Sequence, residues 1–436
     1  MWDFLLDVNV IDGPFILVMY GLSALIAIYL LGREASGSWV LTAIVVLIVG
    51  AMVGASVLWL SVYFFGLFGG SVIDPVWLWV PAAFAGIFLA IWNLWRSRWW
   101  RKLVAMLAIP IFALTAVLGI NAAYGLNPTL GSLLDASTIG SIDPEAPDPD
   151  EADPLDPLYL TWLAPDGMPA KGSIGTVEGG IPNTNSGFPA RPAQIYLPPA
   201  ALVEDAPRLP LVIMMMGQPG DPDASFIGAV LDEYAANHNG LAPIALVIDQ
   251  LGDPANDPLC LNTDRGDVET YVMDDVVPWA LQELNVLRGR QFWTVAGYSN
   301  GGECAAYFGT KYFETFGNLL AISPDEFPGA EQADEVLSTI FGGDQAAYDA
   351  VKPANMMAAR APYPDTTAIF TVGANDADFA PGAQRLADAA ALAGMRTTFF
   401  AVPDADHGVS GLNGGLRKGF EVLYPRLGLA APPPAP

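Results

Sequence analysis

Four long apolar runs near the N-terminus constrain the fold of this chain more than any other feature. They cover about residues 13–31, 39–68, 76–95 and 103–124. Each is near or above the roughly 18 to 20 residues that a helix needs to cross the hydrocarbon core of a bilayer. The first run lacks the basic leader and small-residue cleavage site of a signal peptide. The sequence therefore predicts an α-helical membrane region of four transmembrane helices over residues 1–124.

The basic residues of this region predict its orientation. Arg33 lies between the first two runs, and the remaining basic residues all lie between the third and fourth: Arg96, Arg98, Arg101 and Lys102. Loops rich in Lys and Arg remain in the cytoplasm. With four spans, the N-terminus and the C-terminal part of the chain then both lie on the extracytoplasmic side. We therefore expect a multi-pass protein of the cell membrane, with the lipid bilayer as a partner.

The four runs are expected to anchor the protein rather than to transport a solute. No Asp, Glu, Lys or His lies well inside a run. An ion or proton pathway through a membrane usually needs such residues as relays. Anchoring or packing against a partner helix is therefore favoured over transport.

The composition changes abruptly after the last apolar run. Residues 125–157 are rich in Pro, Asp, Ser and Gly, and include the segment DPEAPDPDEADPLDP. Such a segment buries little apolar surface, and its prolines and like charges extend it. We expect a disordered linker at 125–157, a folded domain at 158–428 and a disordered tail at 429–436.

Strand-like and helix-like segments alternate in the folded part. Apolar runs predict strands at 194–197, 209–216, 244–248, 292–296, 319–322, 367–372 and 397–402, and helices are predicted at 224–236, 271–284, 301–313 and 381–393. Alternation of this kind is typical of a mostly parallel sheet with crossover helices. The expected fold is an α/β-hydrolase domain.

A G-x-S-x-G pattern carries the chemistry of this domain. Gly297-Tyr298-Ser299-Asn300-Gly301 stands between a buried strand and a helix. In that context the pattern is a nucleophile elbow, whose glycines permit a tight turn that exposes the serine. Ser299 is therefore the predicted nucleophile.

Two later segments supply partners for Ser299. Asp376 follows the predicted strand at 367–372, and His407 follows the strand at 397–402. The order Ser, Asp, His is that of α/β-hydrolases. His407 is the predicted base; His238, the only other histidine, is interpreted as a structural residue at a helix end. Asp376 is preferred as the orienting acid; the alternatives are Asp378, Asp404 and Asp406.

The oxyanion hole is predicted from two backbone N–H groups. One belongs to Asn300, directly after the nucleophile, and the other to the loop after the strand at 209–216. Pro219 in that loop has no N–H, so Gln218 is the expected second donor.

The remaining residue types narrow the function further. A net charge of −27 argues against nucleic acid as a partner. Two histidines and two cysteines are too few for an evident metal site, so neither a metal nor another cofactor is expected. Cys260 and Cys304 should both lie near the carboxyl edge of the sheet, where we expect them to form a disulfide. The alternative is two separate buried cysteines.

The soluble part resembles the esterase family of α/β-hydrolases that includes esterase D, feruloyl esterases and the antigen 85 mycolyltransferases. The residues that carry the resemblance are Glu269-Thr270-Tyr271 through Pro278-Trp279, the elbow GYSNGG, and Ser-Pro-Asp at 323–325. The resemblance implies acyl-ester cleavage or acyl transfer by Ser299, Asp376 and His407. The chain departs from many relatives in having Met216 where a histidine often precedes the glycine.

These observations predict a membrane-anchored serine esterase that forms an acyl-enzyme. Its substrate would be a small ester, a lipid or a cell-envelope glycolipid. One alternative is an acyltransferase of the mycolyltransferase type, which would use the same residues to move an acyl group to a sugar or lipid hydroxyl. Another is a non-catalytic binding module of the cell envelope.

Overall fold

A computed structural model of the chain describes residues 3–6, 8–34, 36–64, 72, 74–125, 127, 129–134, 139–144, 146, 153–254 and 256–433. The chain divides into two compact units, Met1–Thr138 and Ile139–Pro436.

The first unit contains the long apolar helices that the sequence predicts. Within the described residues, four helices are long and apolar enough to cross a membrane: Pro14–Leu31, Gly37–Phe64, Pro75–Asn93 and Trp99–Tyr124. They correspond to α2 (Pro14–Leu31), α3 (Gly37–Trp59) with the π-helical turn η1 (Leu60–Phe64), α4 (Asp74–Asn93) and α5 (Trp99–Tyr124), and two short helices, α1 (Asp3–Leu6) and α6 (Leu130–Leu133), flank them. The structure confirms that the four predicted runs form helices long enough to cross a membrane, and the end of the second run, residues 65–68, lies outside the described residues.

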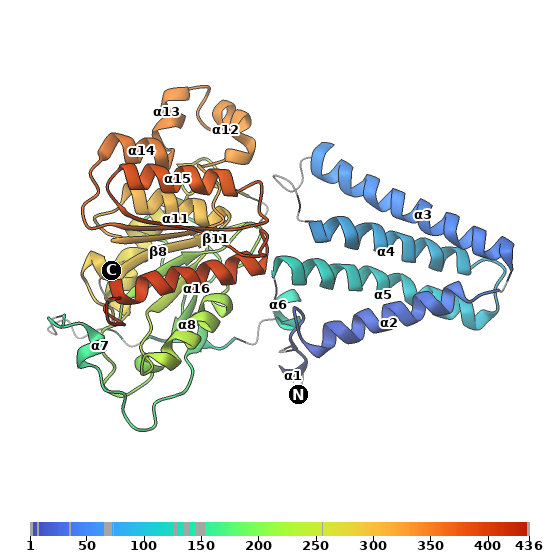
Figure 1. The fold of residues 1–436 in the computed structure, drawn as a ribbon, viewed down its shortest axis with the longest axis horizontal. Helices are drawn as coiled ribbons and strands as arrows, with labels where there is room; N and C mark the ends of the chain where they lie inside the picture. Colours follow the sequence, from blue (N-terminus) through green and yellow to red (C-terminus); the bar gives the residue numbers. More distant parts are fainter. Residues whose placement is uncertain are drawn as a thin grey trace. The chain divides into compact units, whose positions relative to one another are not determined.

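The long helices lie side by side in the order α3, α4, α5, α2 (Figure 1). Small residues permit this close packing. A Cβ on Gly50 of α3 would lie 2.8 Å from the Cα of Ala85, and one on Gly54 would lie 2.9 Å from the Cβ of Phe84. A G-x-x-x-G pair is a common interface of membrane helices because it lets two backbones approach.

The second unit is built on one mixed sheet. Among the described residues its strands lie in the order β1-β2-β3-β5-β4-β8-β9-β10-β11. Their bounds are β1 (Ser141–Ile142), β2 (Ser173–Val177), β3 (Gln194–Leu197), β4 (Leu211–Met215), β5 (Ile244–Ile248), β8 (Trp293–Tyr298), β9 (Asn318–Ile322), β10 (Thr367–Gly373) and β11 (Arg396–Val402). β3 pairs antiparallel with β2 and β5, and the other pairs are parallel. A hairpin of β6 (Asn262–Thr263) and β7 (Gly266–Asp267) lies apart from this sheet.

Helices cover both faces of the sheet. Figure 1 shows α11 (Asn300–Lys311), α14 (Pro353–Arg360) and α15 (Ala380–Leu392) on one face, and α8 (Ser225–Asn237) and α16 (Val409–Arg426) on the other. The shorter helices are α7 (Leu158–Thr161), α9 (Val268–Thr270), α10 (Val277–Glu283), α12 (Ala333–Thr339) and α13 (Gln345–Ala350). The central strands β4, β5, β8, β9 and β10 are buried along their whole length. This layering confirms the predicted α/β-hydrolase class.

The structure differs from the sequence predictions in several elements. The helix predicted at 271–284 is a π-helical turn, η3 (Tyr271–Val276), followed by α10. Pro278 has no N–H to donate, so a regular helix cannot continue through it with every hydrogen bond intact. The segment α16 was not predicted, because its four glycines, at 411, 414, 415 and 419, lower the helix propensity.

The range expected to be a disordered linker also contains ordered residues. Ser141–Ile142 form β1, which pairs with β2, a strand that was not predicted either. Gly175 of β2 permits the contact, because a Cβ there would lie 2.3 Å from Ile142. In the range expected to be a disordered tail, Leu429 is buried, and residues 434–436 lie outside the described residues. The exact limits of linker, domain and tail stay predictions.

Candidate active site

The turn between β8 and α11 places Ser299 in a strained conformation. Its φ of 55° and ψ of −121° lie outside the regions that residues other than glycine favour. The Ser299 N–H donates to the carbonyl oxygen of Ile322 at 2.9 Å, which ties the turn to the end of β9. The hydroxyl is thereby held at the carboxyl edge of the sheet.

The two glycines of the elbow are required by close backbone contacts. A Cβ on Gly297 would lie 1.8 Å from the carbonyl oxygen of Gly301, and a Cβ on Gly301 would lie 2.2 Å from that of Met215. No side chain tolerates such distances. These contacts explain why the G-x-S-x-G pattern has glycine at both ends.

Ser299, His407 and Asp376 form a hydrogen-bonded relay. His407 Nε2 lies 2.9 Å from Ser299 Oγ, and His407 Nδ1 lies 2.7 Å from Asp376 Oδ2. Because a carboxylate only accepts, Nδ1 carries the proton and Nε2 is free to accept one from Ser299. The side chain of Asp376 is 3% exposed and that of His407 is 15% exposed, so the relay is largely shielded from water.

Neighbouring loops hold Asp376 and His407 together. Asp376 follows β10 and His407 follows β11, and these strands pair in parallel. The N–H of Asn375 donates to the carbonyl oxygen of Ala405 at 2.8 Å. The relay thus depends on a direct backbone link between the two loops.

Two aromatic residues that the sequence did not single out contact His407. The ring of Phe379 stacks on the imidazole with a centroid distance of 3.8 Å and an interplanar angle of 26°. The hydroxyl of Tyr298 donates to the carbonyl oxygen of His407. The only signal in the sequence is proximity: Tyr298 precedes Ser299, and Phe379 follows Asp376 by three residues.

The predicted oxyanion donors lie on two segments at the same edge. A Cβ on Gly217 would lie 3.2 Å from the Cβ of Ser299, so the loop that carries Gln218 lies against the nucleophile. Asn300 is the first residue of α11, and the first N–H groups of a helix have no acceptor within it. Two backbone N–H donors near Ser299 would stabilise an oxyanion, and their role stays a prediction.

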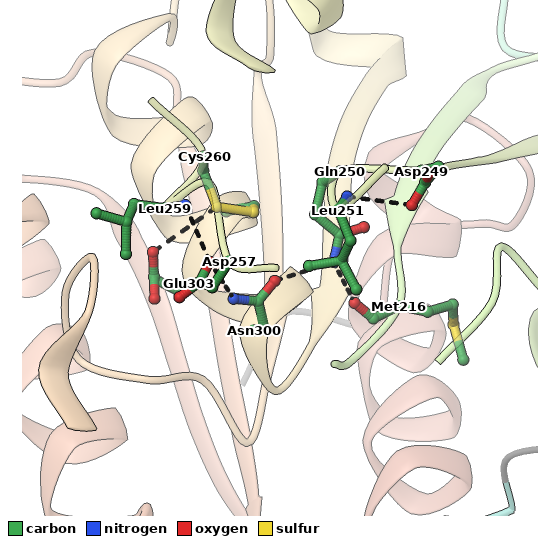
Figure 2. Close-up of a disulfide and its surroundings, with 10 residues drawn as sticks. Met216, Asp249, Gln250, Leu251, Asp257, Leu259, Cys260, Asn300 and Glu303 are labelled. Atoms are coloured by element: carbon green, nitrogen blue, oxygen red, sulfur yellow. Dashed lines mark hydrogen bonds between the residues drawn. A yellow bond between two sulfur atoms is a disulfide. The ribbon is translucent and has the colours of Figure 1, made fainter. Parts of the chain in front are cut away.

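Cys260 and Cys304 form a disulfide near the start of α11 (Figure 2). Their Cα atoms are 5.3 Å apart, and Cys304 lies on α11. Leu259 and Cys260 both have positive φ, 65° and 58°. Two consecutive residues in this conformation store strain, and the disulfide holds the loop that contains them against α11.

Several carboxyl groups interact with Glu303, the residue that precedes Cys304 on α11. Burial raises the pKa of Glu303 well above its usual range, and the nearby charge of Asp257 adds to this effect. Burial also raises the pKa of Asp257. Burial, followed by the charge of Glu331, raises the pKa of Asp325 to about 8. Part of this group is therefore protonated near neutral pH.

His238 lies at the C-terminal end of α8, where its Nδ1 is 2.7 Å from the carbonyl oxygen of Tyr234, in agreement with a structural role. Among the residues that the structure describes, no group of three or more His, Cys, Asp or Glu side chains could hold a metal ion.

Comparison with known proteins assigns the chain to a family. The sequence model of the family described as "Putative esterase" matches residues 189–410. An uncharacterized protein of Corynebacterium glutamicum is 30% identical over 342 residues, which cover 75% of this chain and 76% of the relative.

Solved structures of low sequence identity also align with the chain. A ferulic acid esterase is 15% identical, with 59% of this chain and 99% of that chain covered and a TM-score of 0.47. An S-formylglutathione hydrolase from Agrobacterium tumefaciens is 16% identical, with 60% and 98% covered and the same TM-score of 0.47. The family match spans about half of the chain and includes Ser299, Asp376 and His407. The chain therefore belongs to the Putative esterase family of α/β-hydrolases and is an enzyme of the serine hydrolase type.

Proposed function

We propose that this protein is a membrane-anchored esterase that cleaves carboxylic esters with Ser299 as nucleophile, His407 as general base and acid, and Asp376 as the orienting carboxylate. The observation that carries the proposal is the continuous relay of 2.9 Å and 2.7 Å from Ser299 Oγ through His407 to Asp376. A hydroxyl, an imidazole and a buried carboxylate in this order are the parts that acyl transfer requires.

The first half of the reaction forms the acyl-enzyme. Ser299 Oγ bonds to the ester carbonyl carbon while its proton moves to His407 Nε2, and the carbonyl oxygen becomes an oxyanion. The N–H groups of Gln218 and Asn300 stabilise that charge. As the C–O bond of the ester breaks, His407 returns the proton to the leaving alcohol.

The second half releases the acid. His407 Nε2 takes a proton from water, whose oxygen attacks the acyl carbon. The bond to Ser299 Oγ then breaks, and the proton passes from His407 to Ser299. Asp376 remains ionised and stabilises the imidazolium that forms in each half.

Placement outside the cytoplasm is part of the proposal. Its support is the location of Arg33, Arg96, Arg98, Arg101 and Lys102 in two loops between the apolar helices. The disulfide between Cys260 and Cys304 adds to this support, because disulfides persist in oxidising compartments. An enzyme anchored there would have lipid and cell-envelope glycolipid esters within reach, and we propose these as its substrates.

A fluorophosphonate probe tests the chemistry. In the purified full-length protein in detergent, the probe should modify Ser299, as peptide mass spectrometry would show, and Ser299→Ala should not react. An intact protein that hydrolyses no short-chain ester and is not labelled would contradict an esterase function and would favour a binding module.

A further inference from the structure

The buried side chain of Gln250 bridges the two segments that carry the predicted oxyanion donors. Gln250 follows β5 and is 3% exposed. Its Nε2 donates to the carbonyl oxygen of Met216 at 2.5 Å and to Asn300 Oδ1 at 3.0 Å. Figure 2 shows both bonds converging on this one amide group.

The two acceptors belong to the two halves of the oxyanion hole. Met216 begins the loop that carries Gln218, and Asn300 is the residue after Ser299. The N–H donors themselves are backbone groups, so their positions depend on how these two segments are held. Gln250 fixes one segment relative to the other through its two N–H bonds.

Further hydrogen bonds restrain both segments. Asn300 Nδ2 donates to Asp257 Oδ1 at 3.1 Å, so its side-chain amide is held from both ends (Figure 2). At the far end of the loop, Arg191 donates to the carbonyl oxygen of Gly220 at 3.0 Å and to the carboxylate of Asp249, which precedes Gln250. The dipeptide Asp249-Gln250 thus restrains both ends of the loop.

We infer that Gln250 is a positioning residue that sets the distance between the Gln218 and Asn300 N–H donors. The inference rests on the proposed function. Oxyanion donors act only within a narrow range of distance from the developing charge, and a displacement of about 1 Å weakens catalysis strongly. Loss of Gln250 should therefore weaken binding of the transition state more than binding of the ester.

Two substitutions of similar size break the bridge. Gln250→Met fills the same volume without polar atoms, and Gln250→Glu keeps the shape but has at most one O–H donor, which cannot serve both acceptors. We expect each to lower kcat for a short-chain ester about 10- to 100-fold, less than the loss of a whole oxyanion donor, with KM changed by less than about threefold. The Ki of a trifluoromethyl ketone, which forms a tetrahedral adduct with Ser299, should rise by the same factor as kcat/KM falls.

Asn318→Ala is the matched control. Asn318 is also a fully buried amide, and its Nδ2 donates to the carbonyl oxygens of Gln291 and Trp293 at 2.9 Å and 3.2 Å. It begins β9 and so lies at the edge of the sheet opposite Ser299. This variant should lower the melting temperature but leave kcat and the ketone Ki unchanged.

Asn300→Ala tests the link from its other end. This variant keeps the backbone N–H but loses the acceptor for Gln250. The double variant with Gln250→Met should be hardly worse than either single variant, because all three break one connection. If the fold-loss of kcat in the double variant equals the product of the two single losses, the result would contradict the bridge.

The outcomes separate this inference from the proposed function. If Ser299→Ala abolishes activity while both Gln250 variants keep wild-type kcat and ketone Ki, the positioning role is wrong and the esterase function stands. A rise of KM that accounts for the whole loss of kcat/KM, with kcat unchanged, would also overturn the positioning role. If the wild-type protein neither binds the ketone nor cleaves esters, the proposed function itself fails.

Discussion

His407 is restrained on several sides, which would prepare it for the proposed proton transfer before any substrate binds. Asp376 holds Nδ1, Phe379 covers one face of the ring, and Tyr298 holds the carbonyl oxygen of the same residue. A side chain with several fixed contacts loses little entropy when it reaches the transition state. The strained backbone of Ser299 has the same effect on the nucleophile.

Substitution of the relay residues should abolish ester cleavage. We expect Ser299→Ala and His407→Ala each to lower kcat by several powers of ten, and Asp376→Asn by about 10⁴-fold through the wrong imidazole tautomer. Steady-state hydrolysis of a short-chain p-nitrophenyl ester measures kcat for each variant. As a control, Asp378→Asn should have a much smaller effect. Near-normal turnover in Ser299→Ala or His407→Ala would contradict the assignment, and a larger loss in Asp378→Asn would change the identity of the acid.

The raised pKa of Glu303 predicts that the hydrolase domain becomes less stable as pH rises. Burial raises this pKa, so the folded state binds a proton that the unfolded state has released. Such a group contributes stability that is present below its unfolded pKa and is lost as pH rises through its folded pKa. Asp325, with its pKa raised to about 8, acts in the same direction. We expect the melting temperature of the full-length protein in detergent to fall between about pH 5 and pH 8.

Glu303→Gln should reduce this dependence. The amide introduced by this substitution cannot ionise, so the variant lacks the free-energy penalty of a buried carboxylate. Its melting temperature at pH 8 should exceed that of the wild type by about 2–4 °C for each kcal/mol of this penalty. Glu421→Gln is the control, since the Glu421 side chain is 65% exposed. If Glu303→Gln and the wild type decline equally with pH, the buried carboxyl is not the cause.

At the scale of elements, the parallel strands bring the site together. β5, β4, β8, β9, β10 and β11 are adjacent and parallel, so their carboxyl ends meet at one edge. Gln250, Met216, Ser299, Asp376 and His407 all follow these ends. Residues separated by up to 108 positions in the chain thus come within hydrogen-bond distance.

The disulfide should stabilise this edge. Cys260 and Cys304 are separated by 44 positions, for which the chain-entropy model gives a stabilisation of about 4 kcal/mol. Reduction should therefore lower the melting temperature of the wild type, while the same reductant should not affect Cys260→Ala/Cys304→Ala. Two thiols that react with iodoacetamide in the unreduced, denatured protein would contradict the disulfide.

At the scale of the whole molecule, one unit is the proposed membrane anchor and the other is the hydrolase domain. The anchor is predicted to keep the loop between α4 and α5 in the cytoplasm and residues 143–157 outside. Protease added to intact cells should therefore cut within 143–157 and release the hydrolase unit. Because residues 125–157 contain no Lys or Arg, proteinase K is suitable and trypsin is not.

A labelling experiment supplies the control for this topology. A cysteine introduced as Ala152→Cys should react with a membrane-impermeant maleimide on intact cells. One introduced as Ser97→Cys, in the loop with Arg96 and Arg98, should react only after permeabilisation. The opposite pattern would reverse the proposed orientation.

Some elements can be predicted from the sequence because the residues that indicate them lie close together in the chain. The apolar runs are long enough to span a bilayer, and the resulting helices are found nearly where predicted. Ser299, Asp376 and His407 could be identified because a turn motif and two strand ends mark them, and the structure brings these three together. The antiparallel pairing of β2 and β3 was not foreseen, since short strands such as β2 carry little periodicity.

By itself, the sequence determined the long apolar helices, the order of strands and helices around the elbow, and the candidate nucleophile with its candidate partners, because each of these depends on neighbours within a few residues. Only the tertiary structure decided which other side chains contact the segments around the candidate site. Gln250 lies 34 positions from Met216 and 50 from Asn300. A buried amide at the end of a strand has no pattern that reveals its partners. The role proposed for Gln250 follows from adjacent parallel strands, which place distant residues at one edge, where a buried N–H group must find an acceptor.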